Sequence, residues 1–185
     1  MNTKAASVTD MIKKLSAKNL ISYEKYYGVN ITIHGKAEAL HIIRKHRLWE
    51  TFLVQKLGFT WDEVHEVAEQ LEHIQSPVLI EKLDEFLGFP KMDPHGEPIP
   101  DNKGKIKVQP QTPLDQLQAG YHGVIMAVKD SDPTLLKYLD KIGATPGKKI
   151  KLLRKEQFDE SLEIEINKQK ISISKEVSKN ILVTV

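Results

Sequence analysis

Apolar residues recur at helical spacing through the first half of the chain and at alternate positions in its last third. The helical spacing predicts helices over residues 4–18, 35–57, 60–74 and 77–87, with a hairpin over residues 20–33 between the first two. Thr60 and Glu63 have the spacing of a capping box at the start of the third helix. Ser76 and Pro77 are typical of the first residues of a helix, and they begin the fourth.

After residue 113 the apolar pattern changes to a period of two. It predicts short strands at Val124–Val128, Lys149–Leu153, Leu162–Ile166, Ile171–Ile173 and Ile181–Val185, with a helix over residues 134–141. Several short strands in so small a region favour an SH3-like barrel. Residues 90–113 are rich in proline and glycine and poor in large apolar residues, which is typical of a linker.

The first helix and the hairpin after it have the order of the second half of a winged helix-turn-helix. The turn of the hairpin runs through Lys25–Gly28. In such a module the helix enters the major groove of DNA, and the hairpin with nearby Lys and Tyr side chains contacts phosphates. The alternative is an amphipathic helix that packs on a hairpin for structural reasons only.

Charge is segregated along the chain, although the formal net charge is only +2. Residues 1–50 hold nine Lys and Arg against four acidic residues, whereas residues 61–89 hold eight acidic residues against Lys82 alone. A basic first part followed by an acidic middle fits a polyanion-binding region joined to a cation-binding region. The alternative is a set of ordinary solvated faces.

Composition limits the chemistry that the chain can carry. The chain has 185 residues and no cysteine, which excludes disulfides, thiolate catalysis and cysteine-based metal sites. Its first residues contain no apolar signal core, and no apolar run approaches the ~20 residues of a membrane span. We therefore expect a cytoplasmic protein without membrane contact, and any metal must be held by His, carboxylates, Met or backbone carbonyls.

The third predicted helix separates its apolar residues from a group of imidazoles and carboxylates. Members of this group, within about one quadrant of a helical wheel, are His65, Glu69, Glu72 and His73. Glu69 and Glu72 lie three residues apart, and their repulsion of a few tenths of a kcal/mol is relieved when a divalent cation binds between them. The preceding helix carries His46 and Glu50 at i and i+4. Two neighbouring clusters of His and carboxylate can therefore form.

Oxygen and imidazole donors without sulfur favour Mn(II) or Fe(II), with Zn(II) as a competitor because affinity alone favours it. Two alternatives are a solvated helix face with incidental histidines and a metalloenzyme that uses the clusters to activate water. The remaining histidines lack this carboxylate spacing, so we expect them to be surface or structural residues. They are His34, His41, His95 and His122.

Three segments go beyond generic spacing. Arg44–Glu50, His65–His73 and Pro94–Pro100 closely resemble, in this order, successive motifs of the diphtheria-toxin-repressor family, the metal-dependent iron and manganese repressors of bacteria. The resemblance implies a non-enzymatic transcription regulator, mainly α with a small β part. It implies four regions: a partial winged helix-turn-helix over residues 1–33, a helical metal-binding and dimerisation domain over 34–92, a proline-rich linker over 93–112, and an SH3-like domain similar to the ferrous-iron transport protein A fold over 113–185.

The resemblance also implies the metal ligands. Matching positions assign Glu69, Glu72 and His73 to the primary metal site of the family. His46, Glu50 and His65 match the ancillary site, and in manganese-type members the His46 position joins a binuclear cluster with the primary ligands. The position of Glu69 is cysteine in the iron-responsive branch and glutamate in the manganese-responsive branch, so Mn(II) is the expected metal. In the barrel, Asp130 and Asp132 are further candidates.

The implied macromolecular partner is a palindromic double-stranded operator, bound by a homodimer. Residues that match DNA-facing positions are Lys4, Ser7, Thr9, Asp10 and Lys14 in the recognition helix, with Lys25 and Tyr26 in the wing.

The sequence departs from the family pattern at its start. Family members have two further helices before the recognition helix, which contribute metal ligands and the core of the DNA-binding domain, whereas Met1 lies just before the recognition helix. We interpret this as a start at an internal methionine or a natural truncation. The expected consequence is a dimer that binds Mn(II) weakly and in which metal stimulates DNA binding poorly. An alternative function is thus a metal-binding dimer without metal-coupled DNA binding.

Overall fold

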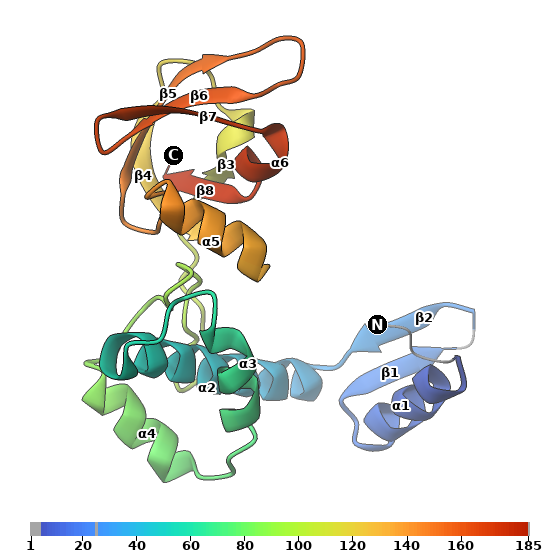
Figure 1. The fold of residues 1–185 in the computed structure, drawn as a ribbon. Coiled ribbons are helices and arrows are strands. Elements are labelled where there is room, and N and C mark those ends of the chain that lie inside the picture. The colour runs from blue at the N-terminus through green and yellow to red at the C-terminus, as the bar shows by residue number, and fades with distance from the viewer. Residues whose placement is uncertain (1–4, 25, 185) are drawn as a thin grey trace.

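The computed structural model describes residues 5–24 and 26–184, so two of the expected DNA contacts, Lys4 and Lys25, lie outside the described residues. The chain forms three parts: a helix with a hairpin, a group of three helices, and a barrel that lies above those helices in Figure 1. None of the described helices is both long enough and apolar enough to cross a membrane.

The first part consists of α1 (Ala5–Ala17) and the antiparallel hairpin of β1 (Ile21–Glu24) and β2 (Gly28–Ile31). It stands to one side of the other helices (Figure 1). The predicted helix and strands are present, but the apolar stripe of α1 is largely uncovered, since Val8 is 44% and Met11 59% exposed. Among the side chains that the structure describes, no hydrophobic residue before Leu48 is buried.

The second part consists of α2 (Ile33–Leu57), α3 (Val64–Leu71) and α4 (Pro77–Phe86). The hydroxyl of Thr32 accepts a hydrogen bond from the backbone N–H of Gly35 and caps α2, and Gly58 ends it with a left-handed φ of 74°. The hydroxyl of Ser76 caps α4 by accepting from the backbone N–H of Leu79, as the Ser-Pro pair predicted. The buried hydrophobic residues that join the three helices include Leu48, Leu53, Val64, Ala68, Ile80 and Leu83.

Helix α3 is shorter than the predicted helix over residues 60–74. Residues 61–63 form a turn, and Glu63 occupies the N-cap position without a capping hydrogen bond from its side chain. The predicted capping box of Thr60 and Glu63 is therefore wrong. The physical reason is tertiary: the side chain of Trp61 belongs to the hydrophobic core of the barrel, which draws this turn away from helical geometry.

The third part is an antiparallel sheet of six strands with the order β3-β8-β4-β5-β6-β7. In chain order its elements are β3 (Gln111–Pro113), a 3-10 turn (Leu114–Gln116), β4 (His122–Val128), α5 (Pro133–Lys141), β5 (Lys149–Lys155), β6 (Leu162–Ile166), β7 (Gln169–Ile173), α6 (Lys175–Ser178) and β8 (Ile181–Thr184). The five predicted strands and the SH3-like architecture are confirmed. Strand β3 lies in the predicted proline-rich stretch, and its three residues are too few for a period of two to be visible.

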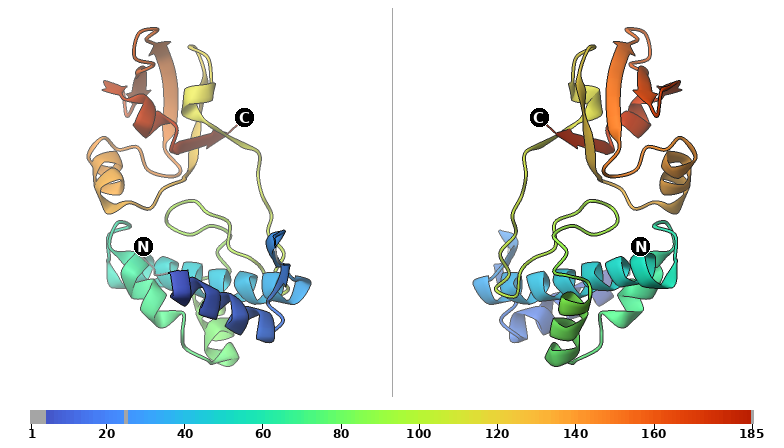
Figure 2. Two further views of the ribbon diagram at one scale, coloured as in Figure 1. Left: turned by 90° about the vertical axis from the view of Figure 1, so that its right-hand side faces the viewer. Right: turned by 90° about the vertical axis from the view of Figure 1, so that its left-hand side faces the viewer.

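Residues 93–100, expected within the linker, are instead packed between the helices and the barrel. Asp93, His95 and Ile99 are buried, and an isolated β-bridge joins Met92 to Pro98. Figure 2 shows this segment as a loop between the helices and the barrel. Polar and proline residues are common in linkers, but in this loop they also make hydrogen bonds to residues distant in sequence, such as those from Arg44 and Arg47 to the carbonyl oxygens of Pro100 and Pro98.

Candidate metal centre

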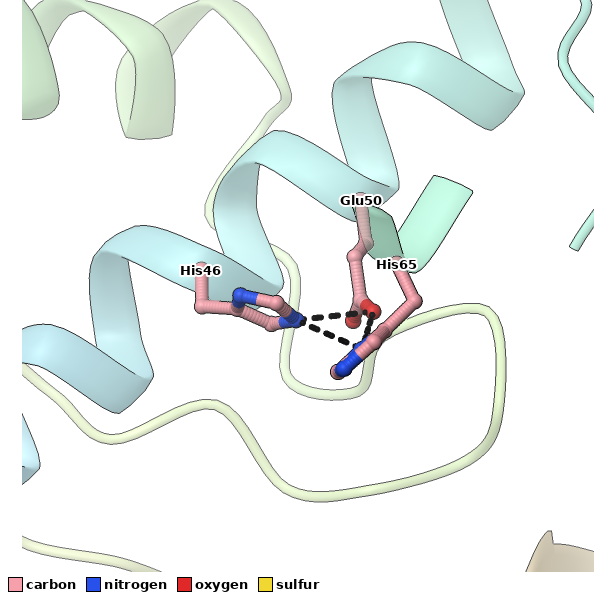
Figure 3. Close-up of side chains that lie close together, drawn as sticks. All are labelled: His46, Glu50 and His65. Carbon is pink, nitrogen blue, oxygen red and sulfur yellow. Dashed lines mark hydrogen bonds and ion pairs between the residues drawn. The ribbon is translucent and has the colours of Figure 1, made fainter. Parts of the chain in front are cut away.

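Helices α2 and α3 bring together three side chains with metal-binding atoms. His46 and Glu50 lie one turn apart on α2, and His65 lies in the first turn of α3. His46 Nε2 is 3.0 Å from Glu50 Oε1 and 3.1 Å from His65 Nδ1, and His65 Nδ1 is 3.4 Å from the same Glu50 oxygen (Figure 3). One ligand atom from each residue lies within 4.8 Å of the other two, which is close enough for all three to bind one ion.

A fourth residue, Glu72, joins this cluster through His46. Glu72 is the C-cap residue that follows the last residue of α3, and its Oε2 is 2.7 Å from His46 Nδ1. Each ring nitrogen of His46 thus has a carboxylate partner. Because carboxylates only accept, both bonds are made at once when both nitrogens carry protons. His46 connects α2 to the end of α3.

The electrostatics agree with this geometry. Burial opposes protonation of His46, but hydrogen bonds and charge from Glu50 and Glu72 outweigh it and raise the pKa of the imidazole. Burial would raise the pKa of Glu50, yet hydrogen bonds and charge from His46 and His95 lower it to about 2. The carboxylate of Glu50 is thus ionised at neutral pH although its side chain is only 3% exposed.

A second cluster shares Glu50 and was not predicted. It consists of Glu50, Asp93 and His95, all three buried, with one ligand atom of each within 4.8 Å of the others. His95 Nε2 is 2.7 Å from the carbonyl oxygen of Trp61, so this nitrogen carries the proton, and Nδ1 faces Glu50 Oε2 at 3.7 Å. We expected His95 to be a surface or structural histidine. It is buried and hydrogen-bonded, but it also faces the candidate metal centre.

Asp93 completes the second cluster. Its Oδ1 accepts hydrogen bonds from the backbone N–H groups of His95, at 2.8 Å, and Glu97, at 3.0 Å. Its Oδ2 is buried without a hydrogen bond, and its nearest charged neighbour is Arg47 Nε at 3.4 Å. Burial and the charge of Glu50 raise the pKa of Asp93 to about 7. The only local sequence signal for this cluster is the two-residue spacing of Asp93 and His95.

The expected ligands of the primary site are distributed unevenly around the centre. Glu69 and Glu72 line a cavity of about 330 Å³ together with His46, Glu50, His65 and His95. His73 lies beyond the end of α3, is exposed, and is not among the residues that line this cavity. In the barrel, Asp132 caps α5 by accepting from the backbone N–H groups of Thr134 and Leu135, and Asp130 accepts from the backbone N–H of Asp132.

The described candidates for DNA contact lie on one exposed unit. Ser7, Thr9, Asp10 and Lys14 are exposed on α1, and Tyr26 is 90% exposed in the turn between β1 and β2. Lys14 Nζ is 2.8 Å from Asp10 Oδ2, and both side chains are largely in solvent. Such an exposed pair is worth little to stability, so Lys14 can turn to another anion at small cost.

The donor set fits a divalent cation. It offers imidazole nitrogen and carboxylate oxygen without sulfur, and the two oxygens of Glu50 face different clusters. The buried Oδ2 of Asp93, which has no hydrogen bond, is the kind of atom that a cation satisfies. The His95 ring also donates its other N–H to a backbone carbonyl, which is the usual arrangement of a metal-binding histidine.

Comparisons with known proteins agree with this site. The family described as "Iron dependent repressor, metal binding and dimerisation domain" matches residues 32–101, and the FeoA domain matches residues 112–185. A solved manganese-dependent transcriptional repressor in complex with manganese is similar with a TM-score of 0.89 and 33% identity, over 99% of this chain and 86% of that chain. The chain belongs to the diphtheria toxin repressor family. The family and its manganese-type branch, predicted from three motifs, are confirmed, and membership favours a regulator over a metalloenzyme.

Curated relatives are matched over part of their length. An uncharacterised HTH-type transcriptional regulator of Methanocaldococcus jannaschii is 38% identical over 47% of this chain and 70% of its own. The iron-dependent repressor IdeR of Mycobacterium leprae is 33% identical over 51% of this chain and 41% of its own. A probable metal transport system membrane protein of Chlamydia trachomatis is 40% identical over 46% of this chain, which is 19% of that protein.

Proposed function

We propose that this protein is a metal-dependent transcription regulator: a homodimer that binds double-stranded DNA when a divalent cation occupies the centre between α2 and α3. The observation that carries the proposal is the placement of His46 between Glu50 and Glu72. Through it, the contact between α2 and the end of α3 depends on the ionisable groups of this centre. The similarity to a manganese-dependent repressor over 99% of the chain supports it.

Mn(II) is the metal that we propose, with Fe(II) as the alternative and Zn(II) as a competitor. His46, His65 and Glu72 would hold one ion with Glu50, and His95 and Asp93 a second, with Glu50 shared. Glu69 and His73 remain proposed ligands, and His73 would have to turn toward the cavity. When bound, a divalent cation would supply the charge that offsets these carboxylates and would take the place of one of the two protons on His46.

The DNA-binding surface that we propose is α1 with the adjoining turn. Its described candidates, Ser7, Thr9, Asp10, Lys14 and Tyr26, are exposed together. A homodimer would present two such helices, and the symmetry of the dimer would make the operator palindromic. Helix α1 lies outside residues 32–101 and 112–185, which the two family domains match, but the similarity to the solved manganese-dependent repressor covers 99% of the chain.

A glutamine variant on α3 with a matched control tests this function. Glu72→Gln keeps an oxygen for His46 but removes a negative ligand, whereas Glu66→Gln changes an exposed glutamate on the same helix that does not line the cavity. Binding of Mn(II) is followed by loss of the electron paramagnetic resonance signal of the free ion. DNA binding is followed by gel-shift selection from random duplex DNA, with and without Mn(II).

Under this proposal wild type and Glu66→Gln bind Mn(II) and enrich a palindromic sequence only when Mn(II) is present, which differs from the poor metal stimulation of DNA binding expected from the sequence. Glu72→Gln should bind Mn(II) at least about tenfold more weakly and enrich no sequence. Wild-type protein that does not bind Mn(II), Fe(II) or Zn(II) would refute the proposal. Metal binding without any enriched DNA would favour the second candidate.

The second candidate is a metal-binding dimer whose metal does not control DNA binding. It is favoured by one specific observation: the two matched family domains cover the helices α2–α4 and the barrel but not α1 and the hairpin. The match to part of a probable metal transport membrane protein also joins this kind of sequence to metal handling. In this case Glu72→Gln would weaken metal binding and leave DNA binding unchanged.

A further inference from the structure

Trp61 lies among the helices in the sequence, but its side chain packs in the hydrophobic core of the barrel. It lies in the turn between α2 and α3, yet its indole, 8% exposed, is part of the barrel core together with Leu136 and Leu139 of α5. The next residue, Asp62, is 3.5 Å from Lys137 Nζ on α5, and the Asp62 side chain is 8% exposed. Figures 1 and 2 show this turn rising toward α5. Trp61 therefore anchors the barrel to the helices.

The same residue holds His95 in place. The carbonyl oxygen of Trp61 accepts a hydrogen bond of 2.7 Å from His95 Nε2, and the two rings stack at 5.8 Å with an interplanar angle of 20°. The hydrogen bond fixes which nitrogen carries the proton, and the stacking fixes the plane of the ring. As a result His95 Nδ1 points toward Glu50.

The barrel also holds the backbone beside this imidazole. The N–H of Val128, at the end of β4, donates to the carbonyl oxygen of His95 at 3.0 Å. Gly96 has a φ of 84°, and a Cβ there would lie 1.8 Å from the carbonyl oxygen of Met126. The close approach of loop and strand thus requires glycine at position 96. His95 is thus fixed from two sides, by Trp61 and by the end of β4.

We propose that Trp61 is a positioning residue for the metal centre: by anchoring the barrel it orients His95 toward Glu50, so that the Glu50–Asp93–His95 cluster binds a cation only while the barrel is docked. This inference rests on the proposed metal-dependent function. It adds a way in which the barrel affects metal binding without supplying a metal ligand. The coupling is reciprocal, so a cation at this cluster favours the docked barrel. The cluster of His46, His65 and Glu72 lies between α2 and α3, and the hydrogen bonds and ring contact described for it do not include Trp61.

Four substitutions in the full chain test this role. Trp61→Ala removes the anchor, Trp61→Phe conserves an aromatic ring, and Gly96→Ala forces the loop off β4 without touching the indole. Trp49→Phe is the matched control, because Trp49 lies in the core of the helices and has no contact with His95 among the ring pairs of the described residues. Mn(II) stoichiometry and affinity are measured by electron paramagnetic resonance, and unfolding by circular dichroism shows that each variant is folded.

Wild type, Trp49→Phe and Trp61→Phe should bind two Mn(II) per chain. Trp61→Ala and Gly96→Ala should keep one and bind the other about 10- to 100-fold more weakly, the usual effect of losing a group that orients a metal ligand. General destabilisation would weaken both ions together. In Trp49→Phe, Mn(II) should quench the fluorescence of the remaining Trp61, whereas in Trp61→Phe the fluorescence of Trp49 should change less.

The outcomes separate the two proposals. A wild-type chain that binds no Mn(II) overturns the proposed function. A wild-type chain with two ions, in which folded Trp61→Ala or Gly96→Ala keeps both affinities, overturns the positioning role alone. If Trp61→Ala does not fold, Gly96→Ala decides.

Discussion

Substitution of Asp93 by asparagine should stabilise the metal-free protein. The Asp93 side chain has 0% exposure, and burial together with the charge of Glu50 raises its pKa from the ordinary value of 3.8 to about 7. Asparagine retains Oδ1, which accepts the backbone hydrogen bonds from His95 and Glu97. It loses the charge that the fold buries. The substitution therefore removes an unfavourable group while the loop keeps its hydrogen bonds.

The sign and the magnitude of the effect follow from the two pKa values. Because the pKa of Asp93 is higher in the folded than in the unfolded protein, ionisation opposes folding between pH 3.8 and about pH 7. Below this window both states are protonated, and above it the penalty is constant. At about 1.4 kcal/mol for each pH unit, the penalty is at most about 4 kcal/mol at pH 8 and about 2 kcal/mol at pH 5. Loss of the contact with Arg47 reduces the gain.

Urea unfolding in the presence of EDTA at pH 5 and pH 8 measures this difference. We expect Asp93→Asn to have the higher free energy of unfolding at pH 8, with an advantage that falls by up to about 3 kcal/mol at pH 5. Added Mn(II) should stabilise wild type more than the variant. Asp101→Asn is the matched control, because Asp101 also accepts from the backbone N–H groups two and four residues ahead but is exposed. The prediction would be refuted if the variant were less stable than wild type at pH 8. It would also be refuted if the free energies of unfolding of variant and wild type differed by the same amount at pH 5 and pH 8.

Two further predictions concern the helices. Leu48→Ala, at a fully buried position, should lower the free energy of unfolding by about 2–5 kcal/mol, whereas Leu57→Ala, 57% exposed, should change it by less than about 0.5 kcal/mol, both measured by urea unfolding. Glu50→Gln should destabilise the metal-free protein at neutral pH: the Glu50 pKa of about 2 lies below its ordinary 4.5, so its contribution is present above pH 4.5 and is lost as the pH falls toward 2. In acid unfolding followed by circular dichroism, the difference in stability between wild type and Glu50→Gln should therefore shrink as the pH falls from 4.5 toward 2. A difference that does not change with pH would show that Glu50 is not ionised in the fold.

Local patterns were sufficient where a structure depends on neighbours in the chain. Ser76 and Pro77 predicted the start of α4, and alternation predicted five of the six strands, because caps and half-buried strands are determined by residues close in sequence. The start of α3 was predicted wrongly because burial of Trp61 in the barrel overrides a capping signal. The buried loop of Asp93 and His95 has the composition of a linker, and its contacts with Trp61, Arg47 and Val128 are too distant in sequence for a local pattern to show them.

Glu50 shows why half of the metal centre could be predicted and half could not. One of its oxygens faces His46, four residues earlier on the same helix, and helical spacing is enough to find that pair. Its other oxygen faces His95, whose orientation depends on Trp61 and on the end of β4. The first contact lies within one helix, whereas the second involves a loop that the barrel also contacts. Changes confined to the barrel interface should therefore alter one side of the centre and spare the other.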